Sequence, residues 1–275
     1  MKTRIITAVV MTAVLVPFFI FSDTVAFPVL VAFLSIVAAY EMLRCAGLDF
    51  SALLLAFSFV VSAAAPFIAR YAGRKIELIF ALYFCYFVLS SVIALFSGGR
   101  LAVSDTAASV GYISYASFGL TSLVFLRDLS GAGIYAVFLP FVISWMTDTF
   151  AYFCGMAIGR HKLIPSVSPK KTVEGSIGGT LFAVLLSALY CFAMNRIFGV
   201  DVSYIAIIVI SFVCSLLSQC GDLIMSLIKR HYGIKDYGRL FPGHGGVLDR
   251  FDSIIITSPF IYLLYIYVPF CEVFR

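Results

Sequence analysis

Long, uninterrupted runs of apolar residues alternate with short polar segments along the chain. A helix needs about 20 predominantly apolar residues to cross a lipid bilayer. About nine runs reach this length, and they cover residues 5–22, 24–43, 51–69, 75–97, 107–126, 132–158, 175–195, 203–228 and 253–270. A transmembrane β-barrel would instead show segments of about ten residues in which apolar and polar positions alternate. The pattern therefore predicts an all-α, polytopic integral membrane protein with about nine transmembrane helices.

The composition excludes a soluble protein. Hydrophobic residues make up 62% of the chain, charged residues make up 12%, and the mean hydropathy is +1.07, whereas about a quarter of the residues in soluble domains are charged. The first run follows the basic segment Met1–Arg4, but no small-x-small cleavage pattern precedes the next run. We therefore expect a retained helix rather than a signal peptide. The seven cysteines show no C-x-x-C spacing and are interpreted as packing residues, not as metal ligands or disulfide partners.

Two polar segments, 159–174 and 229–252, are much longer than the others. Few polar residues occur inside the runs before residue 100, so we expect a transmembrane scaffold at 1–100. The catalytic transmembrane region is then expected at 101–275, with both long loops. No internal repeat is visible, so the inverted duplication typical of secondary transporters is not indicated.

Lysine and arginine residues are unevenly divided between the two sides of the predicted membrane domain. With the N-terminus in the cytoplasm, that side receives Lys2, Arg4, Arg44, Arg100, Arg160, Lys162, Lys170, Lys171, Lys229, Arg230, Lys235, Arg239 and Arg250. The other side receives Arg70, Arg74, Lys75, Arg127, Arg196 and Arg275. The positive-inside rule therefore predicts a cytoplasmic N-terminus, an outward C-terminus and cytoplasmic long loops. Because the basic residues lie in membrane-proximal loops, nucleic acid is not an expected partner.

Two acidic residues fall inside predicted spans. Asp148 precedes Arg160 by twelve residues, which at 1.5 Å per residue places it roughly 18 Å below the interface. Asp222 precedes Lys229 by seven residues and lies roughly 10 Å deep by the same arithmetic. Each carboxylate costs about 2.5–3.5 kcal/mol inside a membrane unless it is paired or hydrated. The two together favour a polar cavity open to the cytoplasm, although each could also pair structurally with a neighbouring helix.

A second group of acids opens the last predicted span. Asp249 and Asp252 are three residues apart, so they share one face of a helix. Together with Asp222 they would form an all-oxygen site suited to Mg²⁺, which uses one or two protein carboxylates together with waters and substrate phosphates. Three acids could hold one cation or two. The alternative is a solvated helix start, where acids favour the positive end of the helix dipole.

Both long loops also carry groups suited to anions. Glycines at 243, 245 and 246 precede the last span and would let backbone N–H groups approach a phosphate. The cations of 229–252 could neutralise phosphates, or could mark only topology or contact with anionic lipid. In the other loop, residues 168–172 offer hydroxyl and ammonium groups beside a helix start. Glycines at 155, 159, 175 and 179 flank this loop, and their spacing allows close helix contact.

These residues form a recognisable pattern. The segment resembles the signature of the phosphatidate cytidylyltransferases, also called CDP-diacylglycerol synthases, at Ser226, Ile228, Lys229, Arg230, Lys235, Asp236, Gly238, Phe241, Pro242, His244, Gly245, Gly246, Val247, Asp249, Arg250, Phe251 and Asp252. Two upstream segments, 168–175 and Gly221 with Asp222, are also similar to this family. The similarity spans roughly 148–253, while the N-terminal third matches only in its hydrophobic character.

The resemblance implies a reaction of CTP with phosphatidate that forms CDP-diacylglycerol and pyrophosphate, as a step of phospholipid biosynthesis. It also implies dependence on Mg²⁺, a location in the cell (inner) membrane and an active site that faces the cytoplasm. The lipid phosphate would attack the α-phosphorus of CTP, so no covalent enzyme intermediate is needed. A homodimer is compatible with the sequence.

The resemblance also assigns roles to individual residues. The metal would be held by Asp222 and Asp249, with Asp252 as a third ligand. Phosphates of CTP or pyrophosphate would be bound by Lys229, Arg230, Lys235 and Arg250, and Asp148 would line the cavity and tune a base or a second cation. Lys170 and Lys171 would bind a phosphate group of the lipid or of the nucleotide. The remaining expected substrate-binding residues are Ser168, Thr172, Glu174, Asp236, His244, Gly245 and Gly246.

Three alternatives remain open. A CTP-dependent kinase of polyprenol-type lipids would use the same nucleotide and metal but would release CDP. CDP-alcohol phosphotransferases fit less well, because their longer arrangement of acids is absent from this chain. An ion-coupled transporter would explain the intramembrane acids but would not need the basic, glycine-rich loop.

Overall fold

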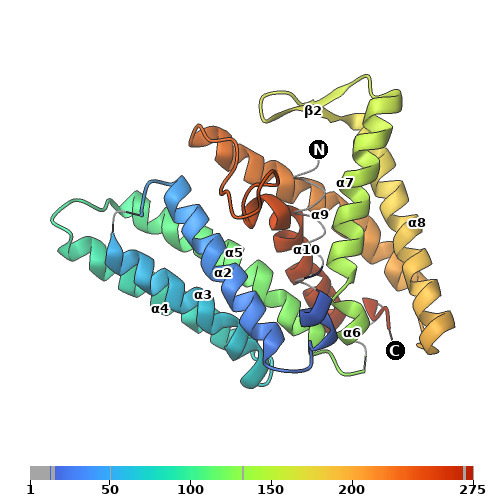
Figure 1. Cartoon of the computed structure of the whole chain (residues 1–275), viewed down its shortest axis with the longest axis horizontal. Coiled ribbons are helices and arrows are strands. Elements are labelled where there is room, and N and C mark those ends of the chain that lie inside the picture. Colours follow the sequence, from blue (N-terminus) through green and yellow to red (C-terminus); the bar gives the residue numbers. More distant parts are fainter. Residues whose placement is uncertain (1–12, 14–15, 50, 132, 269–270, 275) are drawn as a thin grey trace. The chain divides into compact units, whose positions relative to one another are not determined.

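The computed structural model describes residues 13, 16–49, 51–131, 133–268 and 271–274 (Figure 1). Contacts between Cα atoms divide the chain into two compact units. Unit 1 contains the described residues up to Asp128 together with Tyr232–Phe251, and unit 2 contains Leu129–His231 and the described residues from Asp252 onward. The predicted boundary near residue 100 stays a prediction.

Unit 1 is a bundle of the helices α2 (Ala26–Cys45), α3 (Ala52–Tyr71), α4 (Ile76–Phe96) and α5 (Val103–Arg127). Helix α2 packs against α3 and α5, and α4 also contacts both α3 and α5. Inside the bundle the Tyr86 hydroxyl lies 2.7 Å from the Ser58 hydroxyl and 3.0 Å from the Ser109 hydroxyl. This buried chain joins α4 to α3 and α5 through interhelical hydrogen bonds, which hold helices together where no water competes.

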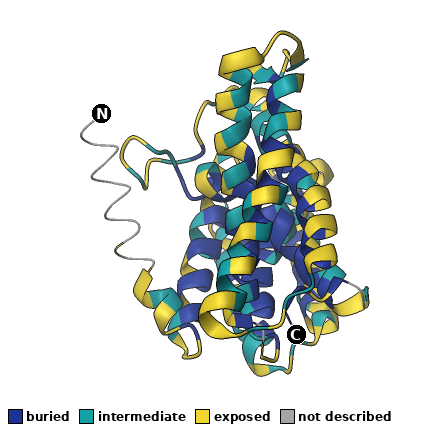
Figure 2. Ribbon diagram, turned by 90° about the vertical axis from the view of Figure 1, so that its right-hand side faces the viewer, coloured by how far each residue is buried: buried dark blue, intermediate teal, exposed yellow. Residues whose placement is uncertain are grey.

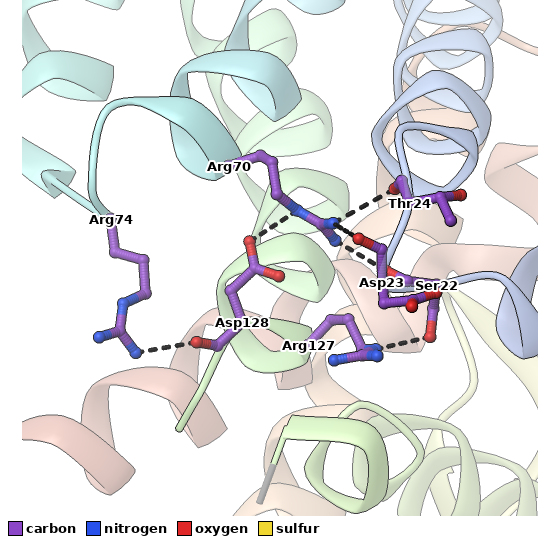
Figure 3. Close-up of polar contacts among 7 residues, drawn as sticks. All are labelled: Ser22, Asp23, Thr24, Arg70, Arg74, Arg127 and Asp128. Atoms are coloured by element: carbon purple, nitrogen blue, oxygen red, sulfur yellow. Dashed lines mark hydrogen bonds and ion pairs between the residues drawn. The ribbon is translucent and has the colours of Figure 1, made fainter. Parts of the chain in front are cut away.

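A cluster of charged residues ties one end of unit 1 together (Figure 3). The Arg70 guanidinium pairs with the Asp128 carboxylate at 2.8 Å and donates to the backbone carbonyls of residues 22–24 at 2.8–3.2 Å. Arg127 Nε donates to the Ser22 hydroxyl at 2.5 Å. Burial raises the pKa of Asp128, while the nearby guanidinium groups oppose that shift. The cluster therefore fixes the C-terminal ends of α3 and α5 to the segment that precedes α2.

Unit 2 begins with the short helix α6 (Gly133–Ala136), which is followed by α7 (Leu139–Ile158). A two-stranded antiparallel hairpin of β1 (Lys162–Ile164) and β2 (Ser168–Thr172) leads into α8 (Val173–Phe198) and α9 (Tyr204–His231). Helix α8 packs against α7 and α9. The predicted run 132–158 is interrupted before α7, where Pro140 occupies the first turn, because proline lacks the N–H that a continuous helix would use.

Helix α10 (Leu248–Tyr267) belongs to unit 1 up to Phe251 and to unit 2 from Asp252. It begins at Leu248, five residues before the predicted run at 253–270, and it contains Asp249 and Asp252 in its first turns, as predicted for acids that open the last span. Acids are favourable there because the first N–H groups of a helix give it a positive end. The predicted loop 229–252 is correspondingly shorter.

The predicted polytopic, all-α membrane fold is confirmed. In the described part of the chain, seven helices are long and apolar enough to cross a membrane. Many of the large apolar side chains on α4 and α8 are exposed, as expected for helices that face lipid. Figure 2 marks the exposed residues along the helices in yellow. Of the predicted first span, residues 5–12, 14 and 15 lie outside the described residues, while 16–20 are helical. The total of about nine spans stays a prediction.

The glycines of α7 and α8 let these helices approach closely, as their spacing predicted. A Cβ atom on Gly175 would lie 2.6 Å from the Ala151 carbonyl oxygen, and one on Gly179 would lie 2.6 Å from the Thr147 carbonyl oxygen. Both distances are far below ordinary van der Waals contact, and the opposing atoms are backbone. No larger residue could occupy either position without separating the two helices.

Gly179→Ala is therefore expected to destabilise the protein by about 1–3 kcal/mol, the usual cost of overpacking a core. The measurement is the thermal unfolding midpoint in detergent. Gly111→Ala is the matched control, because a Cβ there has no atom within 4 Å and alanine favours a helix over glycine by about 0.5–1 kcal/mol. Equal midpoints for the two variants would contradict the close contact between α7 and α8.

Candidate active site

Unit 2 contains a cavity of about 550 Å³ at the hairpin end of α7, α8 and α9. Its wall is formed by five residues of α7, by both strands of the hairpin, by one residue of α8 and by two residues of α9. The lining residues are Asp148, Ala151, Tyr152, Gly155, Met156, Lys162, Leu163, Lys170, Lys171, Thr172, Ser176, Gln219 and Asp222. The cavity thus combines two carboxylates with three ammonium groups.

The hairpin delivers the lysines to this cavity. Its strands pair Lys162 with Thr172 and Ile164 with Ser168, so β1 and β2 bring cations from both sides of the turn to one wall. Thr172 ends β2 and begins α8, where its hydroxyl accepts a hydrogen bond from the Gly175 N–H at 3.2 Å. This N-cap satisfies one of the unpaired donors in the first turn of a helix. The predicted substrate-binding Thr172 therefore has a structural role as well as a place in the cavity wall.

The principal charged contact of the cavity joins Lys171 and Asp222. Lys171 Nζ forms an ion pair with Asp222 Oδ2, and the two side chains are 24% and 25% exposed. The Ser226 hydroxyl donates to the other oxygen, Asp222 Oδ1, at 3.4 Å. An intramembrane acid needs such a partner, and this pair supplies it while remaining open to the cavity.

A third carboxylate lies close to this pair. Asp252 at the start of α10 is close enough to Asp222 and Asp148 to be repelled by both, and Lys229 partly compensates that repulsion. Like charges brought together in a partly buried place disfavour the ionised state unless a cation balances them. Unit 2 therefore brings three carboxyl groups, from α7, α9 and α10, near one another.

A chain of buried hydroxyl groups connects the helices that form the cavity. The Thr147 hydroxyl donates to Ser215 at 2.9 Å, and Ser215 donates to Thr180 at 3.1 Å. Gln219 Nε2, which belongs to a cavity-lining side chain, donates to the same Thr180 hydroxyl at 3.0 Å. These contacts fix α7, α8 and α9 at the depth of Asp148.

Glu174 serves the backbone that enters the hairpin. Its carboxylate accepts the N–H groups of Arg160 and His161 at 3.0–3.2 Å, and His161 Nδ1 lies 2.6 Å from Glu174 Oε1. These contacts close the base of the hairpin beside Thr172. Glu174 does not line the cavity among the residues described, and its role in substrate binding stays a prediction.

The glycine-rich loop of unit 1 is held by Asp249. Asp249 Oδ2 accepts the N–H of Tyr237 at 2.8 Å and the N–H of Gly246 at 2.9 Å. Between these points, Phe241 and Gly245 form a tight turn in which each backbone N–H bonds the carbonyl of the other residue. Gly245 has φ +89°, a left-handed conformation that favours glycine.

A second cavity, of about 680 Å³, lies in unit 1 beside the end of α2. Its wall includes three basic side chains and one acidic side chain from α2 and the following loop. The lining residues are Arg44, Cys45, Ile234, Lys235, Asp236, Tyr237, Gly238 and Arg239. The predicted residues Lys235 and Asp236 therefore share a concave, basic surface that could hold a phosphate.

The predicted site residues are divided between the units. Unit 2 holds Asp148, Ser168, Lys170, Lys171, Thr172, Glu174, Asp222, Lys229, Arg230 and Asp252. Unit 1 holds Lys235, Asp236, His244, Gly245, Gly246, Asp249 and Arg250. In unit 2 the structure brings Asp148, Asp222 and the two lysines of β2 to one cavity, while the exposed Arg230 lies 3.5 Å from the Val167 carbonyl. Lys162, Ser176 and Gln219 also line this cavity, although the sequence analysis did not select them.

The carboxylates match the oxygen donors that Mg²⁺ prefers. The described residues include no group of three or more His, Cys, Asp or Glu residues placed to hold a metal ion. Mg²⁺ often takes only one or two protein carboxylates and completes its octahedron with waters and substrate phosphates. The carboxylate of Asp222, with those of its neighbours Asp148 and Asp252, therefore suits Mg²⁺. The predicted ligand set of Asp222, Asp249 and Asp252 stays a prediction.

The fold and the cavity define a polytopic membrane enzyme whose polar groups suit the transfer of a phosphate-bearing group. The model of the cytidylyltransferase family matches residues 2–268, and the chain belongs to this family. It is 33% identical over 274 residues to the phosphatidate cytidylyltransferase of Bacillus subtilis, and the matched region covers 96% of this chain and 97% of that protein. It is also 33% identical over 273 residues to the phosphatidate cytidylyltransferase of Staphylococcus aureus (strain N315), covering 97% and 99% of the two chains. The predicted resemblance is confirmed.

Proposed function

We propose that this protein transfers the cytidylyl group of CTP to phosphatidate and so produces CDP-diacylglycerol and pyrophosphate. The observation that carries the proposal is the near full-length similarity to two proteins named phosphatidate cytidylyltransferase. The cavity supports it, since the Lys171–Asp222 pair and two further lysines lie in one cavity wall, where their ammonium groups suit phosphate groups. The kinase and transporter alternatives find no comparable support.

The reaction balances without a covalent enzyme intermediate. A phosphate oxygen of phosphatidate forms a bond to the α-phosphorus of CTP, and the bond from that phosphorus to the bridging oxygen of the β-phosphate breaks. Pyrophosphate leaves with the electron pair. The protein then needs mainly to align the two phosphates and to neutralise their charge.

The side chains of unit 2 are suited to both tasks. Lys162, Lys170 and Lys171 offer ammonium groups to phosphate oxygens in the cavity. Asp222 holds Lys171 in place and, with Asp252, would hold Mg²⁺, while the predicted contribution of Asp249 stays a prediction. When bound, Mg²⁺ would supply charge neutralisation at the phosphates. In unit 2, Lys229 and Arg230 would contact phosphates of CTP or of the departing pyrophosphate. In unit 1, Lys235 and Arg250 have the same predicted role.

The reaction would take place at the cytoplasmic face of the cell membrane, where CTP is present. The support is the distribution of lysine and arginine, which the positive-inside rule translates into a cytoplasmic N-terminus and cytoplasmic loops at 159–174 and 229–252. The basic cavities in both units include residues of these loops.

The position of a radioactive label distinguishes the proposed reaction from its rival. With purified protein, phosphatidate and Mg²⁺, label in the α-phosphate of CTP is expected to enter the lipid, while label in the γ-phosphate is expected in pyrophosphate. A kinase would place the γ-label in the lipid and release CDP. In sealed vesicles, externally added CTP should be used by inside-out vesicles and not by right-side-out vesicles. Absence of α-label in the lipid, from folded protein, would overturn the proposal.

A further inference from the structure

Glu41 is a buried acid that the proposed chemistry does not use. It lies near the C-terminal end of α2 and is 4% exposed. An acid inside a membrane helix costs about 2.5–3.5 kcal/mol unless a partner stabilises it. Its partners are backbone groups: Oε1 accepts the Val247 N–H at 3.0 Å, and Oε2 accepts the Leu248 N–H at 2.9 Å. Val247 directly precedes α10 and Leu248 is its first residue, so Glu41 caps that helix from another helix.

The loop before α10 is built around this carboxylate. A Cβ atom on Gly246 would overlap the Glu41 carboxyl group, and its three nearest atoms all belong to that group. A Cβ atom on Gly238 would overlap Glu41 Oε1 as well. Glycine at these two positions therefore lets two stretches of the loop backbone close against Glu41.

Asp249 holds the same loop through other atoms. Its Oδ2 accepts the Gly246 N–H and the Tyr237 N–H, so Gly246 donates to Asp249 and packs on Glu41 at once. Two acids, one on α2 and one on α10, thus fix residues 237–248. This segment adjoins Lys235 and Asp236 and contains His244, and the family resemblance assigns all three residues to substrate binding.

We infer that Glu41 is a positioning residue, which holds the loop 237–248 in its reactive conformation without contacting substrate itself. The inference rests on the proposed function for its catalytic consequence. Its structural part, that the carboxylate fixes the loop, rests on the hydrogen bonds and glycine contacts alone. Glutamine could not replace Glu41, because both carboxylate oxygens accept an N–H group. The amide nitrogen of glutamine is itself a donor and cannot accept one of them.

The first test compares Glu41→Gln and Glu41→Ala with the wild type. A displacement of the loop by about 1 Å is expected to lower kcat by about 10²-fold, with KM for phosphatidate unchanged. A purely structural role would instead lower the thermal midpoint and leave kcat per folded molecule at the wild-type value. Glu77→Gln is the control, because Glu77 is an exposed glutamate in the first turn of α4.

A second readout does not depend on catalysis. Trypsin should cleave after the exposed Lys235 and Arg239 about tenfold faster in Glu41→Ala, which corresponds to ~1.4 kcal/mol of lost loop stabilisation. Cleavage after Lys162 in unit 2 should not change. If the wild type proved not to be a cytidylyltransferase, this rate would still show whether Glu41 holds the loop. Unchanged trypsin cleavage would overturn the inference, whatever the enzyme catalyses.

A double variant tests the contact itself. Gly246→Ala should impair the enzyme because its methyl group displaces the Glu41 carboxylate from its two donors. In the Glu41→Ala background that obstacle is gone, so Gly246→Ala should cause no further loss of kcat. If the two substitutions lowered kcat by independent factors that multiply in the double variant, this result would contradict a direct contact between the two residues.

Discussion

Asp222→Asn is expected to lower the rate of cytidylyl transfer by about 10²–10³-fold, as other losses of fixed charge in an active site do. The substitution keeps the size of the side chain and an oxygen for the Ser226 hydroxyl. It removes the negative charge that pairs with Lys171 and that would hold Mg²⁺ in the proposed mechanism. The measurement is kcat with saturating CTP and phosphatidate, together with the thermal midpoint, which should change little.

Two further variants separate the possible reasons for that loss. If Asp222 only neutralises Lys171, then Lys171→Gln combined with Asp222→Asn should restore activity relative to Asp222→Asn alone. If Asp222 holds the metal, the double variant should be no better, and Asp222→Asn should need more Mg²⁺ for half-maximal activity. Asp201→Asn is the control, because Asp201 is an exposed acid just before α9. Wild-type turnover of Asp222→Asn would refute its catalytic assignment.

Removal of Mg²⁺ is expected to abolish activity completely. Clustered phosphates and carboxylates repel one another, and a divalent cation supplies the charge that brings them together. Activity should be lost in EDTA and return with excess Mg²⁺, but not with an equal concentration of Na⁺. Mg²⁺ without nucleotide should also raise the thermal midpoint of the wild type more than that of Asp222→Asn, because a ligand stabilises the state that binds it. Full turnover in EDTA would exclude the proposed role of the metal.

Helices were predictable because membrane insertion makes their signal local. A run of about 20 apolar residues must satisfy its own backbone hydrogen bonds in lipid, and only a helix does so within one segment. The predicted runs at 24–43, 51–69 and 75–97 accordingly appear as α2, α3 and α4. The observed helix bounds differ from the predicted runs where a residue interrupts a helix, as Pro140 does in the first turn of α7.

Part of the cavity was predictable for a related reason. Asp148 and Asp222 stand out because each is expensive in its own span, and the structure places both in the wall of one cavity. Lys171, the partner of Asp222, was predicted only from the polar segment 159–174, where hydroxyl and ammonium groups lie beside the start of a helix. Gln219 and Ser176 carry no charge and resemble ordinary packing residues in the sequence, so only the assembled helices reveal that they line the same space.

Tertiary structure decided which distant residues meet. The sequence by itself determined a polytopic helical membrane protein, its family and most of its charged cavity residues, because apolar runs, acids within them and a contiguous signature are all local features. The contact of Glu41 with Val247 and Leu248 joins positions that lie far apart in the chain. No pattern of period or spacing encodes such a contact, because it depends on how α2 packs beside the start of α10. The capping of that helix by a buried acid is therefore a property of the fold, and it became visible only in three dimensions.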